Sequence, residues 1–164
     1  MRQEQFEEFV RGNLPALGRY AYVLTGHRED AADLVQDSLV RLARAWPRVD
    51  EAGSPLAYAK TTMVRTHIST LRRLGRLRRS EFEDLPADDG FGSVDDGVDL
   101  RRALRTLSPV QRAVVVLSFF DDVDDVTIGH QLRRRPGAVR ALRHRALRSL
   151  RAALHDNPNV EVRR

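Results

Sequence analysis

Arginine side chains cluster near the C-terminal end of the sequence, and their spacing predicts contact with a polyanion. Arg133-Arg134-Arg135 is an unbroken run, and Pro136-Gly137 follows it directly. Residues 126–164 hold ten basic and two acidic side chains, a net of +8, in a chain whose overall formal charge is +5. A guanidinium carries planar, paired donors that match a phosphate or the edge of a guanine. This end of the chain is therefore expected to bind nucleic acid.

Two simpler explanations compete with nucleic-acid binding. Among the 28 basic residues Lys60 is the single lysine, as in proteins from GC-rich genomes, whose codons favour arginine. A basic helix face can also simply be solvated. The arginine run lies at one point, in a predicted turn, rather than being scattered, and this placement favours DNA over both alternatives.

Enzymatic chemistry is not indicated by the residue types. The chain has no cysteine, and its five histidines, at positions 27, 67, 130, 144 and 155, lack the spacing of metal ligands. No glycine-rich phosphate loop occurs. We therefore expect no catalytic residues, no metal and no cofactor, and the chain is not predicted to be an enzyme.

The expected location is the cytoplasm, with no membrane partner. The N-terminal residues MRQEQFEEFV lack the apolar stretch of a signal peptide. No run approaches the ~18 consecutive apolar residues of a membrane span.

The arginine run is expected to join two helices. A short helix from about Val126 to Leu132, the turn, and a long helix ending near Leu154 make a helix-turn-helix, whose second helix enters the major groove of DNA. Ile128 and Leu132 provide packing from the first helix. The long helix is expected to bury Val139, Ala146, Leu147, Leu150 and Leu154, and to turn Arg140, His144, Arg145, Arg148 and Arg151 outward.

Further helices precede this motif. An amphipathic segment runs from Leu100 to Leu107. Ser108-Pro109 predicts the start of the next helix, with Gln111 in its first turn. Four aspartates, Asp121, Asp122, Asp124 and Asp125, are expected to break that helix.

The N-terminal block also has helical periodicity. An interruption is expected at Asn13-Leu14-Pro15, with Asn13 as N-cap and Pro15 in the first turn of a helix that stops at Thr25-Gly26. The clearest helix has one apolar stripe between Asp30 and Trp46, and Pro47 is expected to close it. A third helix is expected from Pro55 to Leu74. Because no strand-like alternation occurs, the predicted fold is all-α.

The predicted organisation is two small helical domains joined by a flexible acidic linker. The first domain covers residues 1–79. Residues 80–99 contain eight acids, three glycines and one proline and no basic residue, which is typical of a solvated spacer. The second domain covers residues 100–156, and residues 157–164 form a tail.

Three segments carry a family resemblance. Asp30-Ala-Ala-Asp-Leu-Val-Gln-Asp37, with Ala45-Trp46 at the helix end, is similar to the "DAEDLVQE" of sigma-factor region 2.2. Leu107-Ser-Pro-Val-Gln-Arg-Ala-Val-Val-Val-Leu117 is similar to the "LPxxQRxVxxL" that opens region 4. Pro136-Gly-Ala-Val-Arg140 followed by Arg145-Ala146-Leu147 is similar to "xGTVKxxxxRAL" in the recognition helix. The chain resembles, over nearly its whole length, a bacterial sigma-70-type sigma factor of the extracytoplasmic-function (ECF) group.

The resemblance implies a role in promoter recognition and transcription initiation, with core RNA polymerase (beta-prime and beta subunits) and promoter DNA as partners and an anti-sigma factor as a further candidate. The first domain would be region 2 and the second region 4. The polymerase-binding candidates are Asp33, Gln36, Asp37 and Arg41. The candidates for the melted −10 element are Tyr58, Lys60, Arg65, His67, Arg72 and Arg73, which combine cations with stacking surfaces. The candidates for the −35 duplex are Arg134, Arg135, Pro136, Gly137, Arg140 and His144.

Departures from the family pattern keep alternatives open. Arg65 stands where related sequences often carry asparagine, and Thr70-Leu71 where close relatives often carry tryptophans. A degenerate sigma paralogue that binds polymerase without opening promoters would fit these changes. A helix-turn-helix regulator such as a repressor could share the C-terminal block, but it would not need the N-terminal Asp33-Leu34-Val35-Gln36.

The recognition helix departs from the pattern too. Leu142-Arg143 reverses the usual polar-then-apolar order, so Arg143 is expected to face the edge of the core. Pro136 and Ala138 replace commoner polar residues, which lowers the capacity to read bases.

Overall fold

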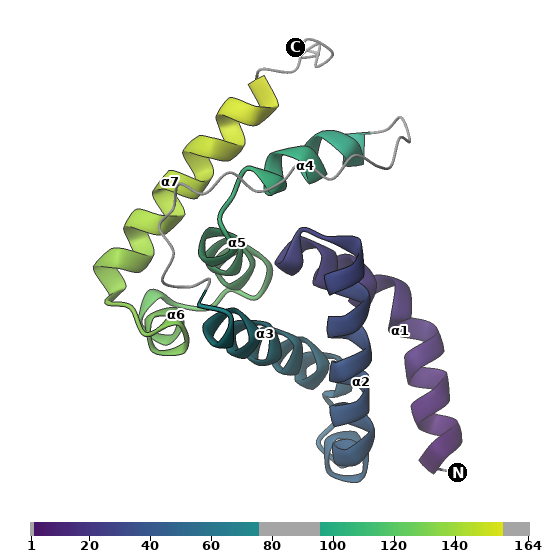
Figure 1. Ribbon diagram of the computed structural model, residues 1–164. Helices are drawn as coiled ribbons and strands as arrows, with labels where there is room; N and C mark the ends of the chain where they lie inside the picture. Colours follow the sequence, from purple (N-terminus) through teal and green to yellow (C-terminus); the bar gives the residue numbers. More distant parts are fainter. Residues whose placement is uncertain (1, 76–95, 156–164) are drawn as a thin grey trace. The chain divides into compact units, whose positions relative to one another are not determined.

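The computed structural model describes residues 2–75 and 96–155, and every regular element in those ranges is a helix (Figure 1). The predicted all-α class is confirmed. The chain divides into two compact units, residues 1–73 and 74–164. The predicted tail and most of the predicted linker lie outside the described residues.

The first unit is a bundle of three helices, α1 (Arg2–Thr25), α2 (Arg28–Glu51) and α3 (Pro55–Arg73), in which each helix contacts the other two. Leu17, Leu24, Leu42 and Met63 are fully buried at its centre. Thr25 and Gly26 end α1 as predicted: Gly26 has a positive φ of 75°, and its N–H donates to the carbonyl of Tyr22 (2.8 Å).

The interruption predicted at Asn13-Leu14-Pro15 is wrong, because α1 is continuous through Pro15. Instead of capping a new helix, Asn13 donates its side-chain amide to the carbonyl of Phe9 (2.8 Å), one turn back. Pro15 is exposed, so the carbonyl that loses its partner at this position lies on the solvent side.

Pro47 does not close α2, which continues to Glu51. Val49 is buried beyond the proline, in line with the buried Leu42, Ala45 and Trp46. Burying this last turn of the apolar stripe outweighs the missing hydrogen bond at Pro47, which is exposed.

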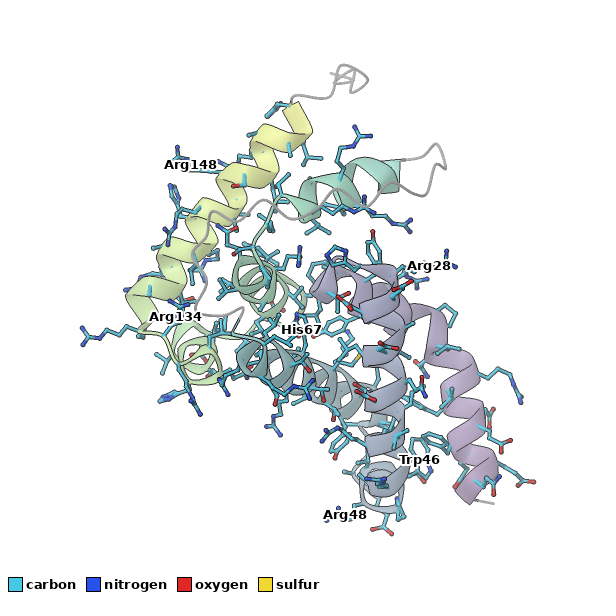
Figure 2. All side chains as sticks on the ribbon, viewed as in Figure 1. Arg28, Trp46, Arg48, His67, Arg134 and Arg148 are labelled. Atoms are coloured by element: carbon cyan, nitrogen blue, oxygen red, sulfur yellow. The ribbon has the colours of Figure 1, made fainter. Side chains whose placement is uncertain are left out.

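Aromatic contacts fix α1 against α2. The ring of Trp46, on α2, lies 5.2 Å from that of Phe6 in an edge-on arrangement and 5.3 Å from that of Phe9. Figure 2 shows Trp46 pointing from α2 towards α1. Such pairs stabilise beyond the area they bury.

The second unit contains α4 (Asp96–Arg105), α5 (Pro109–Val115), the π-helical turn η1 (Val116–Phe120), α6 (Asp125–Leu132) and α7 (Pro136–His155). The helices α4, α5 and α6 all contact α7. The helix α4 begins at Asp96, so the last four residues of the predicted linker are helical. Of the apolar stripe predicted from Leu100, Ala103 and Leu104 are buried, whereas Leu100 is exposed.

Local hydrogen bonds start α5 where the sequence predicts. The Ser108 hydroxyl accepts from the Gln111 N–H (3.2 Å), and the Gln111 side chain accepts from the Ser108 N–H (2.9 Å). Pro109 occupies the first helical position. This reciprocal pair is a capping box, and it sets the direction in which α5 leaves the preceding loop.

A buried arginine connects α5 to the end of α4. Arg112 is 2% exposed, and its Nη1 donates to the carbonyl oxygens of Leu107 (3.1 Å) and Leu104 (3.5 Å). These carbonyls lie at or just beyond the C-terminal end of α4, where helical partners run out and the helix dipole is negative. The guanidinium thereby joins the two helices.

The four aspartates follow η1 and end the helical run, as predicted. The N–H of Asp121 still donates to Val116 (3.2 Å) in the wide π-helical pattern, and Asp122 takes a positive φ of 51°. Asp124 then caps α6: its carboxylate accepts from the Thr127 N–H (2.9 Å) and hydroxyl (2.9 Å).

Candidate nucleic-acid interface

The turn between α6 and α7 is set by backbone hydrogen bonds. The N–H of Arg134 donates to the carbonyl of Gly129 (2.8 Å), and the N–H of Arg133 donates to that of His130 (3.4 Å). Arg133 adopts the left-handed conformation, φ 54°. This pattern is a Schellman motif with arginine at the position that glycine usually takes. It turns the chain sharply, so that α7 starts three residues later.

Gly129 makes this close turn possible. A Cβ atom on Gly129 would lie 2.5 Å from the carbonyl oxygen of Arg134, a distance that real Cβ atoms do not reach. The turn therefore depends on a glycine inside α6, for which the sequence analysis gave no reason.

The turn and the start of α7 present cations to solvent. Arg134, Arg135, Gly137 and Arg140 are exposed, and Pro136, the first residue of α7, is half-buried. In Figure 2, Arg134 extends away from the helices at the N-terminal end of α7. A helix N-terminus with its unpaired N–H groups and positive dipole end favours a nearby phosphate.

One face of α7 continues this basic surface. Arg140, His144, Arg148 and Arg151 recur at spacings of four, four and three residues, which places them on one stripe, and all four are exposed. The opposite side buries Val139, Leu142 and Ala146. Of the other predicted core residues, Leu147, Leu150 and Leu154 are half-buried. We call the exposed residues Arg134, Arg135, Arg140, His144, Arg148 and Arg151 the basic face.

Arg143 does not belong to the basic face, in line with its predicted position at the edge of the core. Its guanidinium forms a two-pronged ion pair with Asp125 of α6 and reaches the Ser118 hydroxyl of η1 (3.4 Å). The hydrogen bonds from Arg143 lower the pKa of Asp125, and the same bonds raise the pKa of Arg143. Arg143 thus ties α7 to α6.

Asp125 is a residue whose role sequence reasoning missed. It was counted only among the aspartates that break a helix. The signal was weak, because Arg143 lies 18 residues away and no local pattern links the two positions.

In the first unit, α3 brings together part of the predicted −10 set. Tyr58, Arg65 and Arg72 are exposed and recur every seven residues, so they lie along one stripe of the helix with only a small drift. Thr61 and Ser69, also exposed, lie between them on the same side. We call Tyr58, Arg65 and Arg72 the α3 stripe. Arg73 is exposed beside it.

Lys60 and His67 lie elsewhere. His67 is 8% exposed and belongs to the buried face of α3 with Met63, Val64 and Ile68, so its prediction as a DNA-contacting side chain is corrected. Figure 2 labels it on α3. Its position is buried because it is opposite Tyr58 and Arg65 around the helix. The Lys60 ammonium lies 5.3 Å from the ring centroid of Tyr20, on α1, in a cation–π arrangement.

The polymerase-binding candidates share the outer face of α2. Asp33, Gln36, Asp37 and Arg41 are all exposed, while the buried stripe of α2 lies on the other side. Val40 stands among them with 47% of its surface exposed, and sequence reasoning had not named it. We call these five residues the α2 face.

Within the described residues, no group of three or more histidine, cysteine or acidic side chains is placed to hold a metal ion. No helix in the same ranges is long and apolar enough to cross a membrane.

Two family profiles match the chain, each over one unit. The profile described as Sigma-70 region 2 matches residues 9–77, and the one described as Sigma-70, region 4 matches residues 97–150.

Individual proteins with similar sequences are also named as sigma factors. The chain is 32% identical to the RNA polymerase sigma-E factor of Streptomyces coelicolor, over 92% of this chain and 86% of that protein. It is 30% identical to the ECF RNA polymerase sigma factor SigL of Mycobacterium tuberculosis, over 85% of this chain and 83% of that one.

A solved structure is also similar. It is that of the sigma factor RpoE from Bartonella quintana in complex with the anti-sigma factor NepR. The TM-score is 0.56 and the sequence identity 26%, with 94% of this chain and 99% of that chain covered.

Proposed function

The chain belongs to the ECF group of sigma-70-type RNA polymerase sigma factors, and from this premise we propose that it recognises promoters through two separate DNA-binding surfaces. The observation that carries the proposal is the basic face, where exposed cations gather along one stripe of α7 and at its N-terminal turn. Arg143, on the same helix, does not belong to this surface, because its guanidinium is paired with Asp125 of α6.

The second unit is proposed to bind the −35 element as duplex. The N-terminal turn of α7 would enter the major groove, so that Arg140 and the half-buried Pro136 and exposed Gly137 approach the bases. Arg134, Arg135 and His144, with Arg148 and Arg151, would contact phosphates and set the register. Each neutralised phosphate makes binding more sensitive to salt.

The first unit is proposed to bind the melted −10 element with the α3 stripe. Tyr58 offers a ring for base stacking, and Arg65 and Arg72 offer cations along the path of a single strand. Arg73 would extend this surface. Lys60 would contact the same strand from its position beside the Tyr20 ring. His67 supports the helix from inside.

Core polymerase is proposed to bind the α2 face. Its carboxylates and amide accept hydrogen bonds, Arg41 donates, and Val40 supplies an apolar centre. The beta-prime and beta subunits are the expected partners.

The two units are proposed to act as a linked pair, residues 1–79 and 100–156, joined by residues 80–99 and followed by a tail, residues 157–164. Two weak DNA-binding surfaces on one chain gain affinity because binding of the first raises the effective concentration of the second. We propose that the chain acts in the cytoplasm and has no catalytic activity of its own, in keeping with its family of regulatory initiation factors. An anti-sigma factor is a further proposed partner.

Run-off transcription with purified core polymerase and a library of genomic fragments tests the proposal. Initiation from a specific set of fragments, only when the chain is added, is the expected result. Core binding without initiation on any fragment would instead identify a degenerate paralogue. Tight duplex binding without core would identify a repressor, although a repressor does not account for the match over residues 9–77.

A further inference from the structure

Two arginines of α7 converge on one carboxylate, that of Asp125. Arg143 occupies both oxygens, with its Nη2 3.2 Å from Oδ2. Arg140, one turn earlier on α7, has its Nη1 3.7 Å from the same Oδ2. Since Arg143 also reaches Ser118, the carboxylate is held firmly at the first residue of α6.

The two arginines differ in what remains available to a ligand. The side chain of Arg143 is 26% exposed, and its Nη atoms are directed to Asp125 and Ser118. The side chain of Arg140 is 62% exposed, and its contact with Asp125 is longer than a hydrogen bond. Most of the five N–H donors of Arg140 therefore remain available on the basic face.

The position of Gly137 also locates the Arg140 guanidinium. A Cβ atom on Gly137 would lie 3.9 Å from Arg140 Nη2. The guanidinium thus lies back over Gly137, at the N-terminal end of α7, as the backward tilt of helical side chains favours. Asp125 on one side and Gly137 on the other define its position.

A restrained arginine reads DNA differently from a mobile one. A long side chain loses rotamer freedom when it binds, and less is lost if the free protein already restrains it. A fixed carboxylate beside the guanidinium also repels phosphates, which weakens contacts that carry no sequence information. Both effects favour binding of the guanidinium to a base edge in one fixed geometry over binding to a phosphate.

We propose that Asp125 is a positioning residue that holds Arg140 for one base pair of the upstream promoter element and so determines how sharply that base pair is read. This inference rests on the proposed binding of duplex DNA by α7.

Selection from a library of duplexes randomised upstream of the start site tests it, with holoenzyme assembled from the full chain and core polymerase. In wild-type holoenzyme, sequencing of the bound fraction yields a preference at each base pair. Arg140→Ala identifies the base pair that depends on Arg140. Asp125→Asn should weaken the preference at that same base pair by about five- to tenfold, within the range of one bidentate base contact. In an Arg140→Ala background, Asp125→Asn should have no further effect there.

Asp124→Asn is the matched control. It removes one negative charge at the neighbouring position, and asparagine can still cap α6, but the Asp124 carboxylate accepts hydrogen bonds from Thr127 rather than from an arginine. The control should keep the wild-type preference. Asp125→Ser is a second neutral replacement, used with a circular dichroism melt of each variant so that a folding defect is recognised.

The outcomes separate the inference from the proposed function. If Asp125→Asn and Asp125→Ser keep the full preference, or lose it evenly at every position, Asp125 does not position Arg140. If Asp124→Asn weakens the same base pair equally, charge alone is responsible and the inference is wrong. If wild-type holoenzyme enriches no upstream sequence, the proposed promoter reading itself fails.

Discussion

Gly129 and Arg134 approach each other through their backbones: the Arg134 N–H donates to the Gly129 carbonyl at 2.8 Å, and the Arg134 carbonyl oxygen faces the place of the missing Cβ. These two residues fix the angle at which α7 leaves α6. The position of the basic face on the second unit therefore depends on a contact that any side chain at residue 129 would disturb.

Replacing Gly129 with alanine should destabilise the second unit. The new Cβ would meet a backbone oxygen at 2.5 Å, so the turn must shift, at a cost of about 1–3 kcal/mol, as for other overpacked sites. Urea unfolding followed by far-UV circular dichroism measures the loss, and duplex binding by holoenzyme should weaken in parallel. Gly137→Ala is the control for stability, because its Cβ would have only an ordinary contact at 3.9 Å. Equal stability of the two variants would contradict the close approach.

Replacing Arg133 with glycine should stabilise the second unit. Arg133 holds a left-handed φ of 54°, which costs a residue with a Cβ about 1 kcal/mol that glycine avoids. Thermal unfolding at low protein concentration measures the gain. Arg133→Ala keeps the unfavourable conformation while removing the charge, and should show no gain. A glycine variant less stable than the alanine variant would mean that the conformation is not strained.

Replacing Arg112 with methionine should loosen the junction of α4 and α5. Methionine keeps most of the aliphatic volume but has no donor, so the carbonyls of Leu104 and Leu107 lose the partner they have in Arg112. The Leu104 carbonyl keeps the N–H of Leu107 as a donor (3.2 Å), but the Leu107 carbonyl loses its bond from Arg112. The expected loss is about 1–3 kcal/mol, since a buried acceptor without a partner keeps its desolvation penalty. Hydrogen exchange should show the largest change in α4 and in the loop that follows it. Arg102→Met, at an exposed position of α4, should change little, and wild-type stability of Arg112→Met would show that the guanidinium is dispensable.

Acid should weaken the second unit through the aspartates of α6. Hydrogen bonds from Thr127 lower the pKa of Asp124, and those from Arg143 lower the pKa of Asp125, in each case below the ordinary value of an aspartate carboxyl. A carboxylate whose pKa is lower in the folded state contributes stability above its unfolded pKa, and that stability is lost as pH falls through the folded value. Urea midpoints should therefore fall as pH drops below about 4, with a shallower fall for Asp125→Asn. Parallel pH profiles for wild type and variant would contradict the contribution of this pair.

Replacing Val40 with aspartate should reduce binding to core polymerase without unfolding the first unit. Val40 is exposed at the centre of the α2 face, so a charge there costs little in the free chain but must be desolvated at an interface. Competition for core polymerase against a labelled wild-type chain measures the change, with an expected loss of at least about tenfold, the size of one interface hot spot. Arg19→Ala, at an exposed position of α1, should compete like wild type. Unchanged competition by the Val40 variant would remove α2 from the proposed interface.

The sequence predictions were correct where a feature depends on neighbouring residues, and they failed where it depends on contacts between residues far apart in the chain. Ser108 and Gln111 were placed correctly because a capping box is a property of four consecutive residues. Pro15 and Pro47 were predicted to break helices because proline lacks a backbone N–H, which is also a local property. The helices continue past them because burial of later residues such as Val49 stabilises the next turn. His67 was predicted to contact DNA from its residue type, but the register of α3 places it on the buried face of that helix. Asp125 and Arg143 meet only because α6 and α7 pack together, which no sequence window contains.

The aromatic contacts of Trp46 have a practical consequence. Trp46 is the only tryptophan among the 164 residues, and it lies edge-on to Phe6 and close to Phe9. The tryptophan fluorescence of the isolated chain thus arises from a single point, the junction of α1 and α2. Any event that lifts α1 from α2 would admit water to the indole and shift its emission to the red, whereas a change confined to the basic face of α7 would leave no direct optical trace. The protein carries a built-in reporter for its first unit alone.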